Sequence, residues 1–138
     1  MTVTAELLEK VPFFRDLPKG SVKRLEKLAN TRSYQAGQDI VKEGDEGVGF
    51  FLISDGKVEV TRGGTSLTTL GQGAFFGEMA LLDHHRRSAT VRAVEPTSCI
   101  TLLRSDFIAE LRGNPDMAIG MLQMMSRRLR ELDEKVTD

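Results

Sequence analysis

The sequence has a single cysteine, no long apolar run and almost no net charge. One cysteine, Cys99, can form no internal disulfide and cannot hold a metal ion alone. No stretch of about eighteen apolar residues is present to span a bilayer, and residues 1–6 have neither the basic start nor the apolar core of a signal peptide. The net charge of −1 provides no overall basic field for nucleic acid. We therefore expect a cytoplasmic protein with no membrane span and no direct contact with nucleic acid.

The length and composition are those of one folded domain. The chain has 138 residues, of which 40% are hydrophobic and 28% are charged, and domains typically have about 100–200 residues. The 13 glycines against only 4 prolines indicate many turns. We expect one domain over residues 1–138, with N-terminal helices in residues 4–30, a β-roll in residues 31–103 and C-terminal helices in residues 105–136.

The N-terminal part is predicted to be helical. Thr4 is a suitable cap for a short helix that runs to Lys10, and Pro12 ends it. Ser21 begins a second segment with apolar residues on one face.

From Arg32 the pattern changes to short strands separated by glycine. Residues 48–54 are apolar on both faces, as in a buried strand. Asp55-Gly56 predicts a tight hairpin, and Gly63-Gly64 predicts a second one. Further strands are expected at residues 57–62, 65–70, 89–94 and 98–103.

The C-terminal part is helical again. Ser105 is predicted to cap a helix that ends near Gly113, and Asn114-Pro115 provides a cap and first residue for a longer helix. Apolar residues in that helix follow a heptad pattern, at positions 118, 122, 125, 129, 132 and 136. This seam either packs on the roll or pairs with a second copy. The predicted fold class is mainly β with flanking helices, an antiparallel β-roll or jelly roll.

Residues 73–93 carry the chemistry. Gly77 allows a close backbone approach, and Glu78–Leu82 fits one helical turn whose free N–H groups favour an anion. Arg87 follows nine residues after Glu78 and offers a forked, permanent cation, and Ser88 adds a hydroxyl. A carboxylate beside a phosphate is costly unless it accepts a hydrogen bond, for instance from a sugar. The pattern therefore favours a nucleotide with a singly charged phosphate.

The runs Phe76-Gly-Glu-Met-Ala-Leu-Leu82 and Arg87-Ser-Ala-Thr-Val91 resemble the phosphate-binding cassette of cyclic-nucleotide-binding domains. We refer to residues 76–90 as the cassette. The resemblance extends from Phe13 to Val136, and Asn114-Pro115-Asp116 and Arg127-Arg128-Leu129 are similar to the long helix of the catabolite activator branch.

The resemblance implies a role for each matching residue. Glu78 would accept from the ribose 2′-hydroxyl, Gly77 and Ala80 would offer backbone amides, and Arg87 would pair with the cyclic phosphate. Ser88 would hydrogen-bond the phosphate, and Ala89 completes the cassette. The positions that would surround the base are Val60, Leu67, Met79, Arg128 and Leu132.

The implied function is a non-enzymatic sensor of a cyclic nucleotide, cAMP or alternatively cGMP, with no further cofactor and no metal. The long helix would close over the base, and a homodimer through that helix and an unidentified effector are the expected partners. Two differences from the activators stand out. Leu132 and Asp133 stand where activators have hydroxyl side chains, and the chain ends at Asp138 without a helix-turn-helix, so DNA binding is not expected.

Two alternatives belong to other functional classes. His84-His85 would serve a haem- or metal-dependent sensor on the same roll, because imidazole is a common metal ligand. A dimerisation module with a degenerate site is the other alternative. Simple packing is expected for Cys99 and for the methionines of the long helix, at positions 117, 121, 124 and 125.

Overall fold

Short helices form the N-terminal end of the fold. The computed structural model describes residues 2–83 and 86–137, and the side chains of Met79 and residues 135–137 lie outside that description. Helices α1 (Val3–Glu9), α2 (Pro12–Arg15) and α3 (Ser21–Leu28) occur in order. The cap of α1 is Thr2, whose hydroxyl accepts from the Ala5 N–H at 3.1 Å, and not Thr4 as expected from the sequence. Pro12 both ends the first helical stretch and begins α2, because its missing N–H is tolerated at a first helical position.

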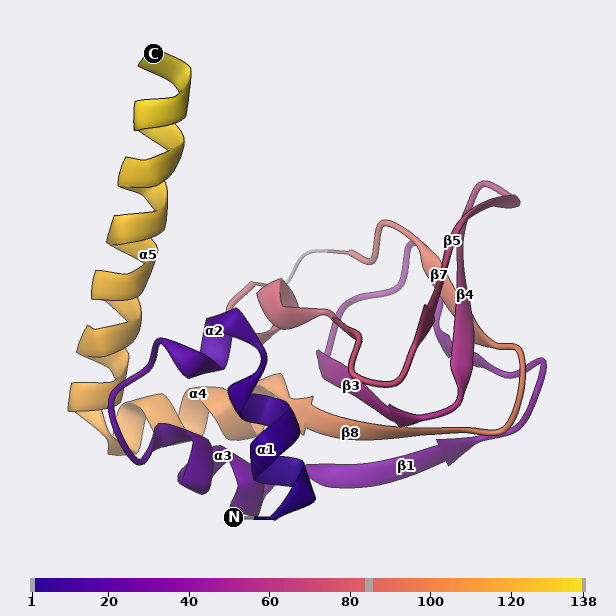
Figure 1. The fold of residues 1–138 in the computed structure, drawn as a ribbon, viewed down its shortest axis with the longest axis horizontal. Coiled ribbons are helices and arrows are strands. Elements are labelled where there is room, and N and C mark those ends of the chain that lie inside the picture. Colours follow the sequence, from indigo (N-terminus) through magenta and orange to yellow (C-terminus); the bar gives the residue numbers. More distant parts are fainter. Residues whose placement is uncertain (1, 84–85, 138) are drawn as a thin grey trace.

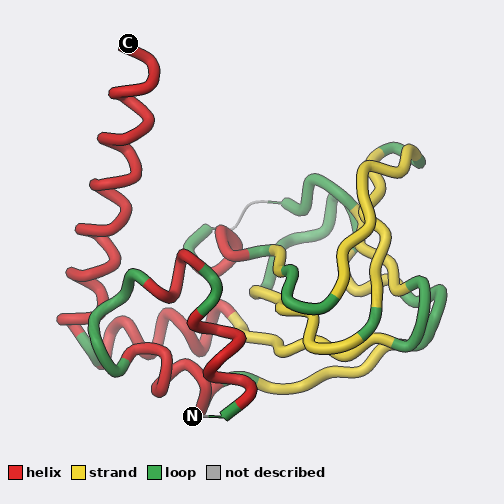
Figure 2. The backbone as a smooth tube through the Cα atoms, in the orientation of Figure 1, coloured by secondary structure: helices red, strands yellow, loops and turns green. Residues whose placement is uncertain are grey.

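Two four-stranded antiparallel sheets form the β-roll, as the sequence predicted. One sheet has the order β1-β8-β3-β6 and the other β2-β7-β4-β5. Figure 2 shows the strands at one end of the molecule and most of the helices at the other. The strands of the two sheets have these bounds: β1 Asn30–Tyr34, β2 Asp39–Val41, β3 Gly49–Asp55, β4 Lys57–Arg62, β5 Thr65–Gly71, β6 Phe75–Phe76, β7 Thr90–Ala93 and β8 Thr97–Leu103.

The turn at Asp55-Gly56 is not the predicted hairpin. Strand β3 pairs with β6 and β8, whereas β4 pairs with β5 and β7, so the chain passes at Gly56 from one sheet to the other. Gly56 has φ +103°, and a Cβ there would lie 2.5 Å from the Thr97 hydroxyl. A glycine is therefore required at this corner for close packing as well as for turning. The predicted Gly63-Gly64 hairpin does join β4 to β5.

Strand β3 separates two apolar cores, and this explains why it is apolar on both faces. Phe50 and Leu52 belong to the core shared with the helices, while Phe51 and Ile53 belong to the core between the sheets. All four side chains are buried. Alternation along a strand sends successive side chains to opposite faces, so one strand supplies both cores. Cys99 is fully buried in the inter-sheet core, which confirms its expected packing role.

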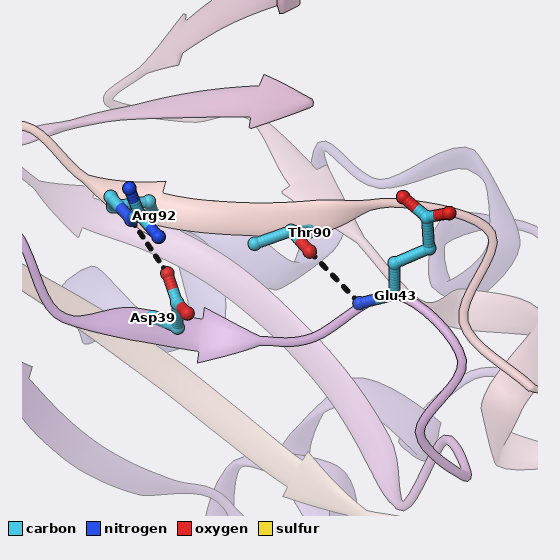
Figure 3. A network of polar contacts seen from close by, with 4 residues as sticks. All are labelled: Asp39, Glu43, Thr90 and Arg92. Carbon is cyan, nitrogen blue, oxygen red and sulfur yellow. Dashed lines mark hydrogen bonds and ion pairs between the residues drawn. The ribbon is translucent and has the colours of Figure 1, made fainter. Parts of the chain in front are cut away.

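Polar contacts attach β2 to β7 and hold the loop that follows it. Figure 3 shows the Arg92 Nε donating to Asp39 Oδ1 at 2.7 Å, and the Glu43 N–H donating to the Thr90 hydroxyl at 2.9 Å. The Gly63 N–H also donates to Glu43 Oε1 at 2.9 Å. The loop after β2 is thereby fixed beside the strand that follows the cassette.

The C-terminal helices are α4 (Arg104–Gly113) and α5 (Pro115–Thr137). Helix α4 begins at Arg104 after Leu103, so Ser105 lies within its first turn and is not its cap, contrary to the sequence prediction. The first half of α5 packs on the helical core through three buried methionines, as expected: Met117, Met121 and Met124. The rest of α5 extends away from the β-roll (Figure 1). In the described part of the chain, no helix is long and apolar enough to cross a bilayer.

Candidate functional site

The second residue of the cassette, Gly77, occupies a position where any side chain would displace its neighbours. Gly77 follows β6 with φ +84° and precedes the single 3₁₀ turn Glu78–Leu81 (η1), which agrees with the predicted short turn. A Cβ at Gly77 would lie 2.5 Å from Arg87 Nη1 and 2.6 Å from the Gly49 carbonyl oxygen. The Gly77 backbone therefore lies directly against the arginine that the sequence assigns to phosphate.

The backbone of Arg87 is held by the loop between β2 and β3. Its N–H donates to the Asp45 carbonyl at 2.7 Å, and its carbonyl accepts from the Gly44 N–H at 2.8 Å. The neighbouring Arg86 donates from Nη1 to the Gly44 carbonyl at 2.7 Å. Since these bonds join segments about forty residues apart, the position of Arg87 depends on both.

The Arg87 guanidinium is half-buried and carries an unneutralised charge. Its Nη2 donates to the Gly49 carbonyl at 2.6 Å, and its Cζ lies 5.8 Å from the centroid of the Phe51 ring. The Nε is buried and has no hydrogen-bond partner. Burial lowers the pKa of Arg87, and the Glu78 charge opposes this only in part. Among the described residues, no carboxylate forms an ion pair with Arg87.

A half-buried guanidinium with a spare N–H donor is suited to an anion. A buried charge is stable only when it is paired and hydrogen-bonded, and arginine presents its donors in a fork that matches phosphate oxygens. The arginine stays charged at neutral pH because its ordinary pKa lies far above 7. The arrangement can therefore bind a phosphate or carboxylate group of a ligand.

The other polar residues of the cassette lie on either side of this cation. Glu78 begins η1, is half-buried, and is close enough for its charge to raise the pKa of Arg87. Ser88 is exposed, and its carbonyl accepts from Arg62 Nε at 3.0 Å. Ala89 is partly buried just before β7. The structure thus gathers Gly77, Glu78 and Arg87 together and leaves Ser88 next to them in the chain.

The Ala80 amide is already in use. Its N–H donates to the Gly77 carbonyl at 3.0 Å and closes the 3₁₀ turn. In this structure Ala80 is therefore not the free donor that the sequence suggested. Between described residues the Glu78 N–H makes no hydrogen bond, because it is the first residue of the turn.

Of the three base-wall positions on the roll, two are described. Val60 on β4 packs against the inter-sheet core and is partly buried, whereas Leu67 on β5 is 49% exposed. The side chain of Met79 lies outside the described part of the structure. The roll by itself therefore leaves the expected base side open to solvent at Leu67.

Helix α5 does not bring Arg128 and Leu132 to the cassette. The Arg128 Nη2 lies 4.0 Å from Asp16 Oδ2, in the turn after α2, and Leu132 is 58% exposed. At the base of the helix, Gly120 lies against the Pro18 ring. The sequence-based placement of these two residues beside the base is not met in this arrangement of α5.

One of two surface hollows borders the cassette, and the other does not. A cleft of about 180 Å³ has Arg87 and Phe51 in its wall, with Tyr34, Val48 and the loop after β2. It is smaller than the roughly 300 Å³ of an ordinary ligand pocket. A larger groove of about 1240 Å³ lies between the N-terminal helices and contains no cassette residue. Of these two hollows, only the smaller includes a cassette residue, Arg87.

Sequence reasoning missed Gly49 and Phe51, which contact Arg87, and it gave no separate role to Phe76 of the cassette. The Phe51 and Phe76 rings stack with centroids 5.1 Å apart and an interplanar angle of 12°. Nothing in the spacing of the sequence connects Gly49 or Phe51 to Arg87, because strand pairing and the loop after β2 bring them together. His84 and His85, the alternative metal or haem ligands, lie outside the described residues. Within residues 2–83 and 86–137, no cluster of three or more His, Cys, Asp or Glu side chains is placed to hold a metal ion.

The family model for the cyclic nucleotide-binding domain matches residues 31–114, which include the whole cassette. The chain belongs to the cyclic nucleotide-binding domain family. Members of this family are regulatory sensors, and the observed antiparallel roll with a long C-terminal helix is their fold.

Known members resemble the chain along most of its length. It is 39% identical over 127 residues to the cyclic AMP receptor protein of Thermus thermophilus, covering 88% of this chain and 59% of that protein. It is 35% identical over 130 residues to a cGMP-dependent protein kinase of Eimeria tenella, covering 94% of this chain and 12% of the kinase. The chain therefore spans less than two thirds of these relatives. A solved N-terminal domain of a transcriptional regulator from Streptomyces coelicolor is 26% identical, with a TM-score of 0.83 and coverage of 96% and 95%.

Proposed function

We propose that this chain is a non-enzymatic cytoplasmic sensor that binds a cyclic nucleotide at the cassette. The observation that carries the proposal is the Arg87 guanidinium, which is half-buried, has a buried Nε without a partner, and forms no ion pair with a described carboxylate. A cyclic phosphate carries one negative charge and two free oxygens, which suits a single forked cation. Membership of the family and the position of Arg87 in the cassette support the same ligand class.

In this proposal each cassette residue contacts one part of the ligand. Arg87 pairs with the phosphate, Ser88 donates its hydroxyl to it, and Glu78 accepts from the ribose 2′-hydroxyl. The Glu78 N–H at the start of η1 and the Gly77 backbone provide the amide side of the phosphate site. Ala80 contributes its amide only by sharing the hydrogen bond it makes to Gly77.

We propose cAMP as the preferred ligand and cGMP as the alternative. The relative named for cAMP is 39% identical to this chain, and the relative named for cGMP is 35% identical. Ser88 leaves the choice open in chemical terms, because its hydroxyl is able to contact guanine as well as phosphate. An apolar cap from Leu132 and walls from Val60 and Leu67 would favour either purine by contact with the ring faces.

Ligand binding is proposed to draw α5 toward the roll. The apolar face of Leu132 is exposed, and Leu67 on the base side is exposed as well. A nucleotide base between them would bury both, and this gives the ligand a higher affinity for the closed state than for the open one. Such a difference in affinity is what shifts a two-state equilibrium. The signal would then pass from α5 to an effector.

We also propose that α5 pairs with a second copy of itself. Its buried methionines use one face, while Leu122, Leu129 and Leu132 are all more than half exposed on another. Leu122 and Leu129 are one heptad apart, and the predicted seam continues through Leu132 to Val136. The side chain of Val136 lies outside the described part of the structure. A repeated heptad seam is complementary to itself. Sedimentation of the wild type and of the L122Q/L129Q variant tests this pairing: a dimer that becomes a monomer supports it, and equal masses contradict it.

Isothermal titration of nucleotide-stripped protein with cAMP and cGMP tests the binding function. We expect micromolar or tighter binding to at least one of them, and the ratio of affinities identifies the preferred base. Arg87→Ala removes the phosphate partner and is expected to weaken binding by about 30-fold to several thousand-fold. Arg112→Ala, an exposed arginine in the last turn of α4, is the matched control and should bind as the wild type does. Absence of binding to both nucleotides by the wild type contradicts the proposal.

A distance measurement tests the movement of α5. Spin labels on Ser66→Cys in β5 and Glu131→Cys in α5 lie at exposed positions, and fully buried Cys99 should stay unlabelled. Diluting the labelled chain with unlabelled chain restricts the signal to distances within one molecule. Closure predicts a shorter distance with saturating cAMP, and an unchanged distribution contradicts it.

A further inference from the structure

The Arg87 guanidinium rests on a pair of stacked aromatic rings. Phe51 on β3 and Phe76 on β6 are direct partners in the antiparallel ladder. Their rings stack at 5.1 Å and 12°, and Phe51 is almost fully buried between the two sheets. The Arg87 Cζ lies 5.8 Å from the Phe51 centroid, on the order of the 6 Å limit for a cation–π contact. Phe51 thus contacts both the Arg87 guanidinium and the Phe76 ring.

Arg87 contacts an aromatic ring, whereas a buried charge is normally paired with an opposite charge. One N–H of the guanidinium is used by the Gly49 carbonyl at 2.6 Å, and no described carboxylate forms an ion pair with Arg87. A carboxylate would neutralise the charge and compete with an incoming anion. An aromatic face attracts the cation through its quadrupole and leaves the charge and the remaining N–H groups available.

The surroundings of Arg87 hold its backbone and one edge of its guanidinium. The backbone bonds to Gly44 and Asp45 hold the Arg87 main chain. At the tip, Nη2 donates to the Gly49 carbonyl and Gly77 lies beside Nη1. Among the described residues, Phe51 provides the aromatic face over which the guanidinium lies. The hydrogen bond therefore fixes one edge of the fork, and the Phe51 ring supports its plane.

We propose that Phe51 is a positioning residue for ligand binding, which holds the Arg87 fork flat and charged for the anionic group of the ligand, with Phe76 supporting the ring. The proposal rests on the proposed function, since the ligand is the cyclic phosphate. Phe51 acts through Arg87 and does not itself contact the phosphate. Its removal should therefore matter only while Arg87 is present.

A double-mutant cycle with a matched control tests this role. Phe51→Leu removes the ring and keeps the residue apolar, while Phe50→Leu makes the same change at the adjacent, fully buried position that faces the other core. Titration with cAMP is expected to show affinity weakened by about 2- to 30-fold for Phe51→Leu and unchanged for Phe50→Leu. Phe51→Tyr, which keeps the ring, should restore most of the affinity. In the Arg87→Ala background, Phe51→Leu should weaken binding by less than about 2-fold, since coupled residues are non-additive.

Arginine side-chain NMR on the ligand-free protein gives a readout that a purely structural role would not change. The Arg87 guanidinium is expected to show restricted rotation and a ring-current shift in the wild type and in Phe50→Leu. In Phe51→Leu the ring-current shift should disappear and the rotation should become faster, although the hydrogen bond from Nη2 to the Gly49 carbonyl remains. This measurement requires no ligand, so it also applies to a variant with weak binding, and Phe51→Met replaces Phe51→Leu should the latter fail to fold.

The results distinguish failure of the positioning role of Phe51 from failure of cyclic-nucleotide binding. Equal affinities of Phe51→Leu and Phe50→Leu, or an equal loss from Phe51→Leu with and without Arg87, would overturn the positioning role while the sensor function stands. A wild type that binds neither cyclic nucleotide overturns the function itself. An Arg87 resonance that is unaffected by Phe51→Leu also overturns the positioning role.

Discussion

The Cα of Gly77 faces the Arg87 guanidinium so closely that a Cβ on Gly77 would lie 2.5 Å from Nη1. The same Cβ would lie 2.6 Å from the Gly49 carbonyl oxygen, which accepts a hydrogen bond from Arg87 Nη2. The flexible arginine tip can move away, but the Gly49 carbonyl is part of a strand backbone. An added methyl group therefore displaces the arginine and also pushes the Gly77 backbone away from Gly49.

This relationship predicts that Gly77→Ala weakens ligand binding by about tenfold or more, because the fork is shifted from its phosphate position. Gly73→Ala is the control, since Gly73 also has positive φ (+89°) but a Cβ there meets nothing within 4 Å. Both variants carry the backbone strain of a positive φ, on the order of 1 kcal/mol in the free energy of unfolding. Titration should show the loss of affinity in Gly77→Ala alone, and similar affinities for the two variants contradict the prediction.

Replacing Arg87 by methionine is expected to affect binding far more than folding. Arg87→Met keeps the aliphatic stem and loses one hydrogen bond, but it also removes a half-buried charge, so we expect the free energy of unfolding without ligand to change by no more than about 1 kcal/mol. At a concentration of 100 times the wild-type Kd, cAMP should stabilise the wild type by about 2.7 kcal/mol and the variant by less than about 1 kcal/mol. Urea unfolding with and without cAMP measures both quantities. A stabilisation of Arg87→Met by cAMP as large as that of the wild type would count against the assigned phosphate contact.

The ion pair between Arg128 and Asp16 is expected to favour the open position of α5. Its atoms lie 4.0 Å apart and both side chains are about two-fifths exposed, so the pair contributes at most about 1 kcal/mol. Asp16 also lies 3.8 Å from the Nε of its chain neighbour Arg15. Asp16→Asn should raise the affinity for cAMP, by no more than about 5-fold, whereas Arg15→Gln, which breaks only the Arg15 contact, should leave it unchanged. Glu110→Gln breaks a comparable pair with Arg24 between α4 and α3 and should also leave the affinity unchanged. A weaker affinity in Asp16→Asn would contradict the prediction.

Burial of Cys99 predicts a loss of stability at alkaline pH. Removal from water raises the pKa of the Cys99 thiol from 9.0 to about 11, so the folded state favours the protonated thiol. This contribution to stability is fully present below about pH 9 and is lost as the pH rises toward 11. Between these values the wild type should lose on the order of 1–2 kcal/mol more free energy of unfolding than Cys99→Ala. Urea titrations at several alkaline pH values measure the difference, and parallel curves for the two proteins would contradict it.

The local features of this protein follow from the sequence. The run of residues 48–54 is apolar on both faces, and that pattern alone predicted the central buried strand, which the structure places at Gly49–Asp55. The spacing of Gly77, Glu78 and Arg87 similarly predicted a short turn followed by a cation, because both depend on residues near one another in the chain. Caps were less accurate, since Thr2 and Leu103 occupy the positions that the sequence pattern gave to Thr4 and Ser105.

Features that depend on distant segments were decided only by the tertiary structure. Asp55-Gly56 has the sequence of a hairpin turn but joins two sheets, because β3 pairs with β8 and β6 while β4 pairs with β7 and β5. Phe51 came to lie under Arg87 through strand pairing and the loop after β2, and the packing of α5 beside the N-terminal helices brought Arg128 next to Asp16. The sequence by itself determined which residues are candidates for the ligand contacts, since side-chain type and local spacing are written in it. Which neighbours orient those residues was decided by burial between segments that meet only in the folded chain.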